Sequence, residues 1–377
     1  MITRVQEETL EQCPDCAGHL RDSKSKRDRI IIDVILPKEP EIVKHVVHQY
    51  WCPNCGEMKE KPVTEAMPGF VTGLKTIAYS AYLHYHQGMS ISKVVENLST
   101  LGMNITAGSL VGGWKALAEL LKPFCEEIGQ KIRGSTEAVY ADETGARQKG
   151  KKFWLWSFST KFEVLFLIRK SRGGDVVREV LGTVFQGILV TDFWKPYLAV
   201  NALLRQWCIA HFLREFKKIE YARSELPDEY WLFKKKVKRL FRDALRSSKK
   251  KLSGQERQAA YERFLKRLDE ITFQEFYDKD VIRLLKRLRK YRDGFFTFVV
   301  RNVDATNNHS ERIIRYAVIM RKTSFHTMSD AGSETMSILM SMFKTLELRD
   351  ENVLEGIILL AQKAIMDKKM KKADLAA

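Results

Sequence analysis

The sequence lacks long hydrophobic runs and has few prolines and cysteines for its length, with nine prolines and six cysteines in 377 residues. No apolar stretch approaches the roughly 18 to 20 residues that a membrane-spanning helix needs. The opening MITRVQEETLEQC has no apolar core of a secretion signal. We therefore expect a cytoplasmic protein without a membrane segment. In a reducing cytosol lasting disulfides are rare, so paired cysteines indicate a metal site first.

Apolar content and positive charge are what the chain does have. Hydrophobic residues make up 45% of it, which is enough for a substantial core, and the length suggests two or three domains at roughly 150 residues each. Lys and Arg number 64 against 47 Asp and Glu, which gives a formal charge of +17. Such a surplus favours a polyanionic partner, nucleic acid above all, over a merely solubilising surface.

The positive charge is concentrated in residues 214–301, which contribute +12 of the +17. Apolar residues recur there at helical spacing, as in Phe233, Val237 and Leu240, between long polar runs. This pattern predicts a basic, mostly helical insertion at about 215–303. Two interpretations stay open: a DNA-binding surface, or ordinary helices with a solvated charged face.

Two short knuckles of paired cysteines lie near the start of the chain, Cys13-Pro-Asp-Cys16 and Cys52-Pro-Asn-Cys55. Each knuckle holds two thiolates on one tight turn, and two facing knuckles supply the four sulfurs of a closed structural zinc site. We therefore predict a zinc ribbon in residues 1–66. Chance cysteines or a redox pair are the alternatives.

The apolar runs between the knuckles, residues 30–36 and 42–47, are predicted strands of this ribbon. Because so small a module buries little core, zinc would supply much of its folding free energy.

Residues 67–134 have the pattern of a helical region. A short turn carrying Gly102 separates the last two expected helices, and Thr106 or Ser109 would cap the final one. This pair resembles a helix-turn-helix, which indicates DNA binding; the alternative is a scaffold that links the ribbon to the next domain. The expected helices span residues 70–85, 90–101 and 109–121.

From residue 135 the periodicity changes to that of an α/β domain, predicted to span 135–377. A short strand, 138–142, ends in Asp142, and an apolar run, 187–192, ends in Asp192. A hairpin of strands 153–159 and 162–169 lies between them, and helices at 175–181 and 194–204 flank the last strand. Three antiparallel strands, a helix and a buried strand follow the order of a ribonuclease-H-like core.

This order brings acidic residues together. If the first and fourth strands are parallel neighbours, their carboxyl ends place Asp142 and Asp192 at one edge of the sheet. Two carboxylates there repel each other unless a divalent cation lies between them, and oxygen ligands favour Mg²⁺ or Mn²⁺. Glu311, near the start of an apparent helix at 310–320, is the candidate third ligand.

At this point the motifs resemble a known family, the transposases of the insertion sequence 66 family, which belong to the DDE class. The resemblance runs from Cys13 to about Ala361. It rests on the two cysteine knuckles and on several ordered blocks: Ala141-Asp142-Glu143-Thr144, Asp192 with Tyr197, Trp207-Cys208-Ile209-Ala210-His211-Phe212-Leu213-Arg214, and Asn307-Asn308-His309-Ser310-Glu311-Arg312 with Arg315, Arg321-Lys322 and Gly332.

The resemblance implies a ribonuclease-H-like catalytic domain in which Asp142, Asp192 and Glu311 bind Mg²⁺ or Mn²⁺. Such an enzyme cuts double-stranded DNA at the ends of a mobile element and joins the freed 3′-hydroxyl to target DNA. It implies a homo-oligomer on DNA, and the family's elements usually encode small accessory proteins as well. Residues that would contact DNA are Asn307, Arg312, Arg315, Arg321, Lys322 and Tyr197.

Other residues near the motifs have more than one interpretation. Cys208 and His211 are too few for a closed zinc site, and we expect them to orient the core near the acidic residues. Trp194 and Tyr197 would either stack on bases or anchor the fold. Two rival functions remain open: a non-catalytic DNA-binding protein derived from a transposase, and a structure-selective nuclease.

Overall fold

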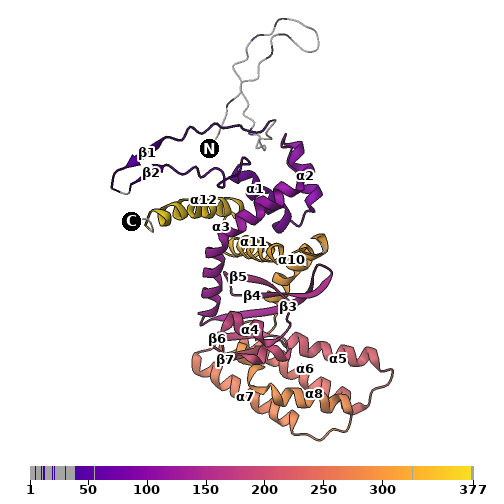
Figure 1. Cartoon of the computed structure of the whole chain (residues 1–377). Coiled ribbons are helices and arrows are strands. Elements are labelled where there is room, and N and C mark those ends of the chain that lie inside the picture. Colours follow the sequence, from indigo (N-terminus) through magenta and orange to yellow (C-terminus); the bar gives the residue numbers. More distant parts are fainter. Residues whose placement is uncertain are drawn as a thin grey trace.

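The computed structural model describes residues 39–54, 56–324 and 326–374, together with the isolated residues 5, 10, 12, 19, 21 and 30. Figure 1 shows an elongated molecule with a strand pair at one end, a central sheet covered by helices, and a layer of helices at the other end. No helix in the described ranges combines the length and apolar character needed to cross a bilayer.

A five-stranded mixed sheet forms the centre of the molecule, in the order β5-β4-β3-β6-β7. Strand β4 pairs antiparallel with β3 and β5, whereas β6 is parallel to β3 and β7 is parallel to β6. The predicted α/β class and the parallel pairing of the first and fourth strands are therefore confirmed. The strands are β3 (Ala138–Gln148), β4 (Lys151–Ser159), β5 (Val164–Arg169), β6 (Val184–Thr191) and β7 (Asn201–Trp207).

Two parts of the sheet differ from the prediction. The first strand does not end at Asp142, because β3 continues to Gln148 while it pairs with β4. The predicted helix at 194–204 is wrong: a short 3-10 helix, η2 (Lys195–Ala199), is followed directly by β7. The predicted helix before the fourth strand is present as α4 (Gly174–Leu181).

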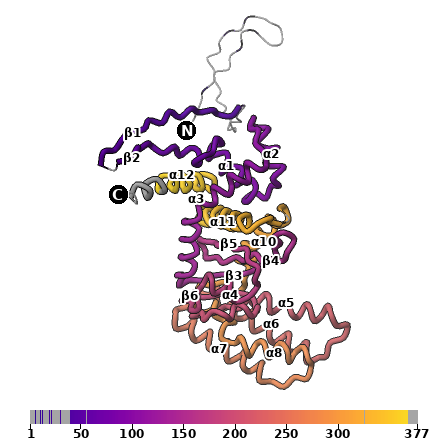
Figure 2. Tube along the Cα trace, in the orientation of Figure 1, coloured from indigo at the N-terminus to yellow at the C-terminus, as the bar shows by residue number. Residues whose placement is uncertain are grey.

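The three expected N-terminal helices are present, but the last, expected at 109–121, extends to Arg133. They are α1 (Leu74–Ala81), a π-helical turn η1 (Tyr82–His86), α2 (Ile91–Thr100) and α3 (Ala107–Arg133). Thr106 caps α3, because its hydroxyl accepts the N–H of Ser109 at 3.1 Å. The tube in Figure 2 follows α3 from this helical end of the molecule down along the sheet. Its buried residues share one hydrophobic cluster with the sheet and the C-terminal helices.

The C-terminal helices are α10 (Asn308–Ser324), α11 (Asp330–Leu348) and α12 (Val353–Asp374); α10 and α11 pack on the sheet, and α12 packs on α11, α3 and α1. The helix α11 runs along the edge strand β5 and supplies its missing hydrogen-bond partners. The N–H of Val164 donates to Thr345 Oγ1 at 3.0 Å, and that of Phe166 donates to Ser341 Oγ at 2.8 Å. The open edge of the sheet is thereby closed by hydroxyl groups rather than by another strand.

The basic segment forms a helical insertion with its own hydrophobic core, as predicted from its apolar spacing. Phenylalanines dominate this core; Phe212, Phe241 and Phe295 contact one another edge to face or tilted. Figure 1 shows the insertion beyond the β7 edge of the sheet. Its elements are α5 (Ile209–Ala222), α6 (Asp228–Ser248), α7 (Gly254–Thr272), α8 (Lys279–Lys290), η3 (Arg292–Gly294) and α9 (Thr297–Val300).

The predicted zinc ribbon is only partly within the described residues. Cys13, Cys16 and Cys55 lie outside them, and so does all but Ile30 of the first expected strand. The second expected strand, 42–47, is wrong: these residues are exposed and form no regular structure, and pairing starts only at β1 (Gln49–Cys52) with β2 (Glu57–Glu60). The turn between these strands is tight, since the Gly56 N–H donates to the Cys52 carbonyl at 2.9 Å.

Candidate active site

Asp142 and Asp192 come from the two parallel strands at the centre of the sheet. The last paired residues of β3 and β6 are Tyr140 and Val190. The same offset carried two residues further sets Asp142 opposite Asp192, directly after Thr191 ends β6. Asp142 therefore lies at the carboxyl end of the parallel pair although β3 itself continues beyond it. Both side chains are half-buried, so they remain accessible to solvent.

Glu311 enters this region in the first turn of α10, and the segment before the helix is tied to the sheet. The Asn307 side-chain amide donates to the carbonyl of Ala141 at 3.0 Å. The backbone N–H of Asn307 donates to the thiol sulfur of Cys208 at 3.1 Å. The start of α10 is therefore held against the residue that precedes Asp142 and against the start of α5.

The acidic residues lie close enough to affect one another electrostatically. Burial raises the pKa of Asp142 from 3.8 to about 7, and the negative charges of Glu143, Asp192 and Glu311 add to this rise. The N–H of Glu143, donated to Asp142 Oδ1 at 2.9 Å, opposes it. A carboxylate whose pKa is raised by neighbouring acids in this way fits a divalent cation, whose charge would remove the repulsion.

Glu311 has protein partners of its own. Its carboxylate is paired with the Arg214 guanidinium on α5, and His211 Nδ1 lies 3.9 Å from the same oxygen. Across the described part of the chain, no three His, Cys, Asp or Glu side chains are grouped closely enough to hold a metal as placed. The three-carboxylate site therefore stays a prediction, and Arg214 occupies only one of the two oxygens of Glu311.

Cys208 and His211 lie beside these acids, at the start of α5. Cys208 is fully buried, and burial raises the pKa of its thiol. Burial and then the Arg214 charge lower the pKa of His211, although Asp192 and Glu311 oppose the shift. Their contacts with Asn307 and Glu311 agree with the orienting role that we predict for them.

The residues predicted to contact DNA divide into two groups. Tyr197 and Asn307 are buried, with 0% and 1% of their surfaces exposed, so neither presents its side chain to a DNA strand. That prediction is corrected for both. Arg321 is also engaged by the protein, since its guanidinium donates to Thr144 Oγ1 and to the carbonyl of Gly145.

Arg312, Arg315 and Lys322 form the second group, on the exposed side of α10. None of the three forms an ion pair with another described residue, so their charges are available to phosphates.

Sequence reasoning missed Glu143 and its partner Arg172, which lie next to the acidic residues. Glu143 follows Asp142, yet its side chain is only 2% exposed, and it forms an ion pair with Arg172 at 2.8 Å. The tyrosine hydroxyl of Tyr197 donates to the same carboxylate. A second acid directly after Asp142 was visible in the sequence, but its partners lie 29 and 54 residues away along the chain.

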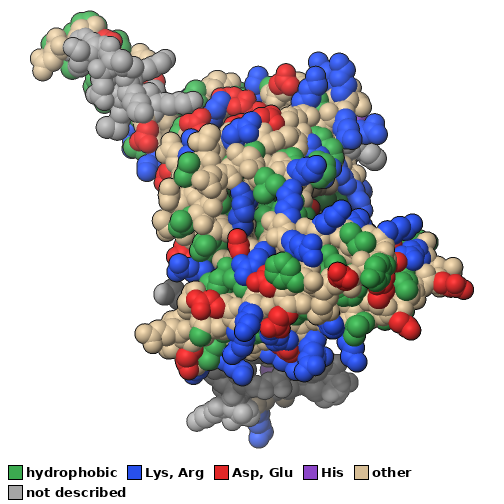
Figure 3. Space-filling view, turned by 90° about the horizontal axis from the view of Figure 1, so that it is seen from below, with side chains coloured by type: hydrophobic (Ala, Val, Ile, Leu, Met, Phe, Trp, Pro, Cys, Tyr) green, Lys and Arg blue, Asp and Glu red, His purple; other side chains and the backbone are tan. Residues whose placement is uncertain are grey.

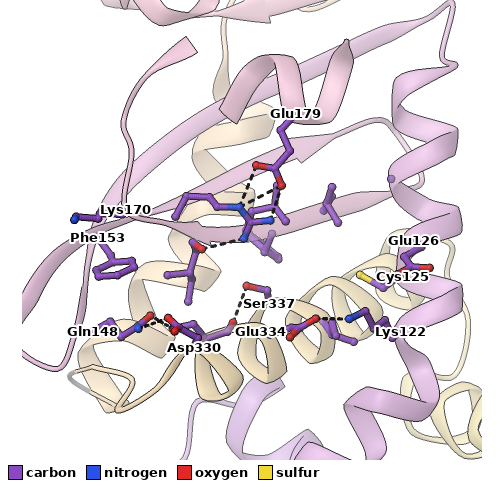
Figure 4. A pocket seen from close by; sticks show the side chains of 18 residues that line it. Lys122, Cys125, Glu126, Gln148, Phe153, Lys170, Glu179, Asp330, Glu334 and Ser337 are labelled. Atoms are coloured by element: carbon purple, nitrogen blue, oxygen red, sulfur yellow. Dashed lines mark hydrogen bonds and ion pairs between the residues drawn. The ribbon is translucent and has the colours of Figure 1, made fainter. Parts of the chain in front are cut away.

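A cavity of about 670 Å³ lies elsewhere, between α3, β5 and α11. Figure 4 shows that several polar side chains around it already have partners: Lys122 reaches Glu334, and Gln148 reaches Asp330. Asp142, Asp192 and Glu311 are not among its lining residues. We therefore place the candidate active site at the sheet edge and not in this cavity.

Comparisons with known proteins show the family of this chain. The model of the transposase IS66 family matches residues 69–335, well over half of the chain. The model of the zinc-finger binding domain of transposase IS66 matches residues 11–56, which include both cysteine knuckles. A comparison with curated proteins gave no match. The zinc-finger model matches the part of the chain that carries the knuckles, and the transposase model matches the part that forms the sheet. Because the second match covers well over half of the chain, the chain belongs to the IS66 family of transposases.

Proposed function

We propose that this protein is a DDE-type DNA transposase whose metal-dependent site is formed by Asp142, Asp192 and Glu311. The observation that carries the proposal is the parallel register of β3 and β6, because its offset, continued two residues beyond Tyr140 and Val190, would bring Asp142 opposite Asp192. The hydrogen bonds of Asn307 to Ala141 and Cys208 hold the start of α10 against the sheet, which supports Glu311 as the third ligand. A bound Mg²⁺ or Mn²⁺ would stabilise negative charge on the attacking and leaving oxygens of a phosphodiester.

The proposed reaction has two displacements at phosphorus. In the first, a water oxygen bonds to phosphorus and the bond to the 3′-oxygen breaks, which leaves a 3′-hydroxyl and a 5′-phosphate. In the second, that 3′-oxygen bonds to phosphorus in target DNA, and the target's own 3′-oxygen leaves. The chain would hold the strand by its phosphates through Arg312, Arg315 and Lys322, which are exposed on α10 beside Glu311.

Three finer statements belong to the same proposal. Cys13, Cys16, Cys52 and Cys55 would bind a structural zinc ion, as the match to the zinc-finger domain suggests. The domain division at 1–66, 67–134 and 135–377 is supported by the end of α3 at Arg133 and the start of β3 at Ala138. We further propose a homo-oligomer on DNA, aided by accessory proteins, with cytoplasmic location.

A nicking assay tests the proposed function. The substrate is duplex DNA that carries the inverted repeats flanking the gene, with Mg²⁺ or Mn²⁺ present or absent. Wild-type protein should nick it only with metal, and Asp192→Asn should lower the rate at least about 100-fold, since a lost carboxylate removes a metal ligand. Asp293→Asn serves as the matched control, because Asp293 is 84% exposed and lies in the insertion.

Each result of this assay decides between the candidate functions. Metal-dependent nicking that Asp192→Asn abolishes supports the transposase, and joined products support strand transfer. DNA binding without nicking would contradict it and support the alternative, a non-catalytic DNA-binding protein derived from a transposase. Cleavage confined to branched DNA would instead indicate a structure-selective nuclease.

A further inference from the structure

Glu143 is a buried acid whose carboxylate oxygens both have partners. Arg172 donates from Nε and Nη2 to Oε1 at 3.0 and 2.8 Å, and the Tyr197 hydroxyl donates to Oε2. Burying a carboxylate is unfavourable unless it is paired and hydrogen-bonded, and a well-packed apolar residue usually stabilises such a position as well or better. The cluster therefore calls for an explanation other than stability.

Arg172 is held in place on both faces of its guanidinium. It lies in the segment between β5 and α4, 4.3 Å from the ring centroid of Trp154 and 4.0 Å from that of Trp194. Two aromatic faces and two bonds to one carboxylate leave the guanidinium little freedom. Trp194 is also bonded to this segment directly, because its indole N–H donates to the Arg172 carbonyl at 3.4 Å.

Trp194 and Tyr197 both belong to the segment that carries Asp192. The backbone N–H of Trp194 donates to Asp192 Oδ1 at 2.8 Å, so the place of Trp194 sets the direction of that carboxylate. Tyr197, in η2, holds the other end of the segment through Glu143. Residues 192–197 are thus fastened to β3 through Glu143 and to the segment after β5 through Arg172.

From these contacts we infer that Glu143 and Arg172 are positioning residues, which fix residues 192–197 so that the Asp192 carboxylate stays turned toward Asp142. The inference rests on the proposed function, because it assigns the pair a task at the same site. Glu143 directly follows Asp142 on β3, whereas Arg172 lies just after β5, the last of the antiparallel strands. The ion pair between Glu143 and Arg172 therefore links both sides of the acidic site. Partners that orient metal ligands typically change metal affinity or activity by about 10- to 100-fold when removed.

Manganese titration calorimetry on the full-length protein tests this inference with Mn²⁺ itself as the probe. Arg172→Ala should weaken the Mn²⁺ binding that Asp192→Asn abolishes, by about 10- to 100-fold. Arg172→Lys should not restore it, because lysine lacks the planar fork that bonds twice and stacks. Binding of inverted-repeat DNA without metal should be unchanged, since the role acts through Asp192.

Arg169→Ala is the matched control. Arg169 lies three residues earlier and also pairs with a glutamate, Glu179, but at an exposed site outside the cluster. Its Mn²⁺ affinity should equal that of the wild type. Tyr197→Phe is a second test variant in case Arg172→Ala does not fold, because it deletes only one hydroxyl from a buried side chain. It too should weaken Mn²⁺ binding.

The outcomes separate this inference from the proposed function. If Arg172→Ala folds and binds Mn²⁺ with wild-type affinity, the positioning role is overturned. If Arg172→Ala does not fold, wild-type Mn²⁺ affinity of Tyr197→Phe overturns it instead. In either case a loss of binding in Asp192→Asn still supports the metal site. A fall in Tm without any change in Mn²⁺ affinity also overturns it, since that is the result of a purely structural ion pair. No Mn²⁺ binding at all by the wild type, or binding that survives Asp192→Asn, contradicts both.

Discussion

His84 is a buried histidine of η1, apart from the acidic site. Its ring stacks on Trp114 with the centroids 4.7 Å apart, and its Nδ1 lies 2.7 Å from the Met89 carbonyl oxygen. Burial lowers the pKa of His84 below its usual 6.5, although the Met89 carbonyl opposes the shift. Because the unfolded chain then takes up the proton first, this histidine contributes stability near neutral pH that is lost as the pH falls below 6.5.

His84→Phe should remove that pH dependence. Phenylalanine keeps an aromatic ring against Trp114 but has no group to protonate. Thermal unfolding between about pH 7 and pH 5 should show the wild type losing more Tm than the variant, so that the difference between the two narrows as the pH falls. The same substitution at the exposed His48 is the control and should reproduce the wild-type profile. Parallel profiles for wild type and His84→Phe would contradict the prediction.

Single residues show where prediction from the sequence ends. The neighbouring parallel strands that carry or precede Asp142 and Asp192 were predictable because apolar runs followed by a carboxylate form a local pattern, although β3 continues beyond Asp142. The prediction for Tyr197 was wrong because it also used only local sequence. An aromatic residue after a strand can stack on a base or pack in the core, and only the fold reveals the hydrogen bond of Tyr197 to Glu143. Arg172 gave no local signal, since its two indoles lie 18 residues before and 22 after it.

At the scale of elements, the contact between α11 and β5 makes a testable contribution to stability. Ser341→Ala would leave the N–H of Phe166 buried without its hydroxyl partner. An unsatisfied buried donor costs about 1 to 3 kcal/mol, so the free energy of unfolding should fall by that amount. Chemical denaturation measures it, with Ser99→Ala, an exposed serine of α2, as the control. Equal stability of the two variants would mean that another group bonds to Phe166.

The helix α6 carries a row of basic side chains along one face. Lys235, Lys238, Arg242, Arg246 and Lys249 follow one another at three- or four-residue steps, and all five are exposed. None has an ion pair among the residues that the structure describes. Figure 3 looks onto the insertion and shows Lys and Arg side chains spread across this face, with acidic and apolar groups among them. The row would extend over about 21 Å of helix.

Changing the first four of these residues to glutamine should lower the dependence of DNA affinity on salt. The slope of log K against log salt should become shallower by about 0.9 for every phosphate that the variant no longer neutralises. The control removes the same charge from Lys218, Lys234, Arg267 and Arg292, which are already paired with acids. Binding to a duplex of arbitrary sequence is measured over a salt series. A slope that stays at the wild-type value would show that this face is only solvated.

Elements built from local contacts were predictable, and those built from distant ones were not. The helix α3 ends at Arg133, well beyond the expected end at residue 121, although proline usually breaks a helix. Pro123 lies inside it, and Glu119, whose carbonyl loses its helical partner, is on the exposed side. The strand β7 was predicted as helix, but it pairs in parallel with β6, and the Thr297 hydroxyl, 92 residues away, donates to the carbonyl of Arg205.

On the scale of the whole molecule, the chain has two large hydrophobic clusters that meet at β7. One combines the sheet with the N- and C-terminal helices, and the other fills the insertion. The knuckle at Cys52 belongs to neither cluster. Loss of the proposed zinc should therefore affect the N-terminal module and leave the catalytic core folded.

Cys52→Ser tests that separation. Metal analysis should find about one zinc ion per wild-type chain and a loss of zinc in the variant, because four thiolates are needed for a closed site. The main thermal transition should stay within a few degrees of the wild type. Full zinc content in Cys52→Ser would refute the four-thiolate site, and collapse of the main transition would refute the independence of the core.

The central claim is that Asp142, Asp192 and Glu311 share a divalent ion. Crystals of the full-length protein grown with Mn²⁺ test it most directly, through anomalous scattering at the manganese edge. The account predicts a peak within about 2.0 to 2.3 Å of oxygens from all three carboxylates. Saturating Mn²⁺ that leaves these carboxylates without a peak would contradict it.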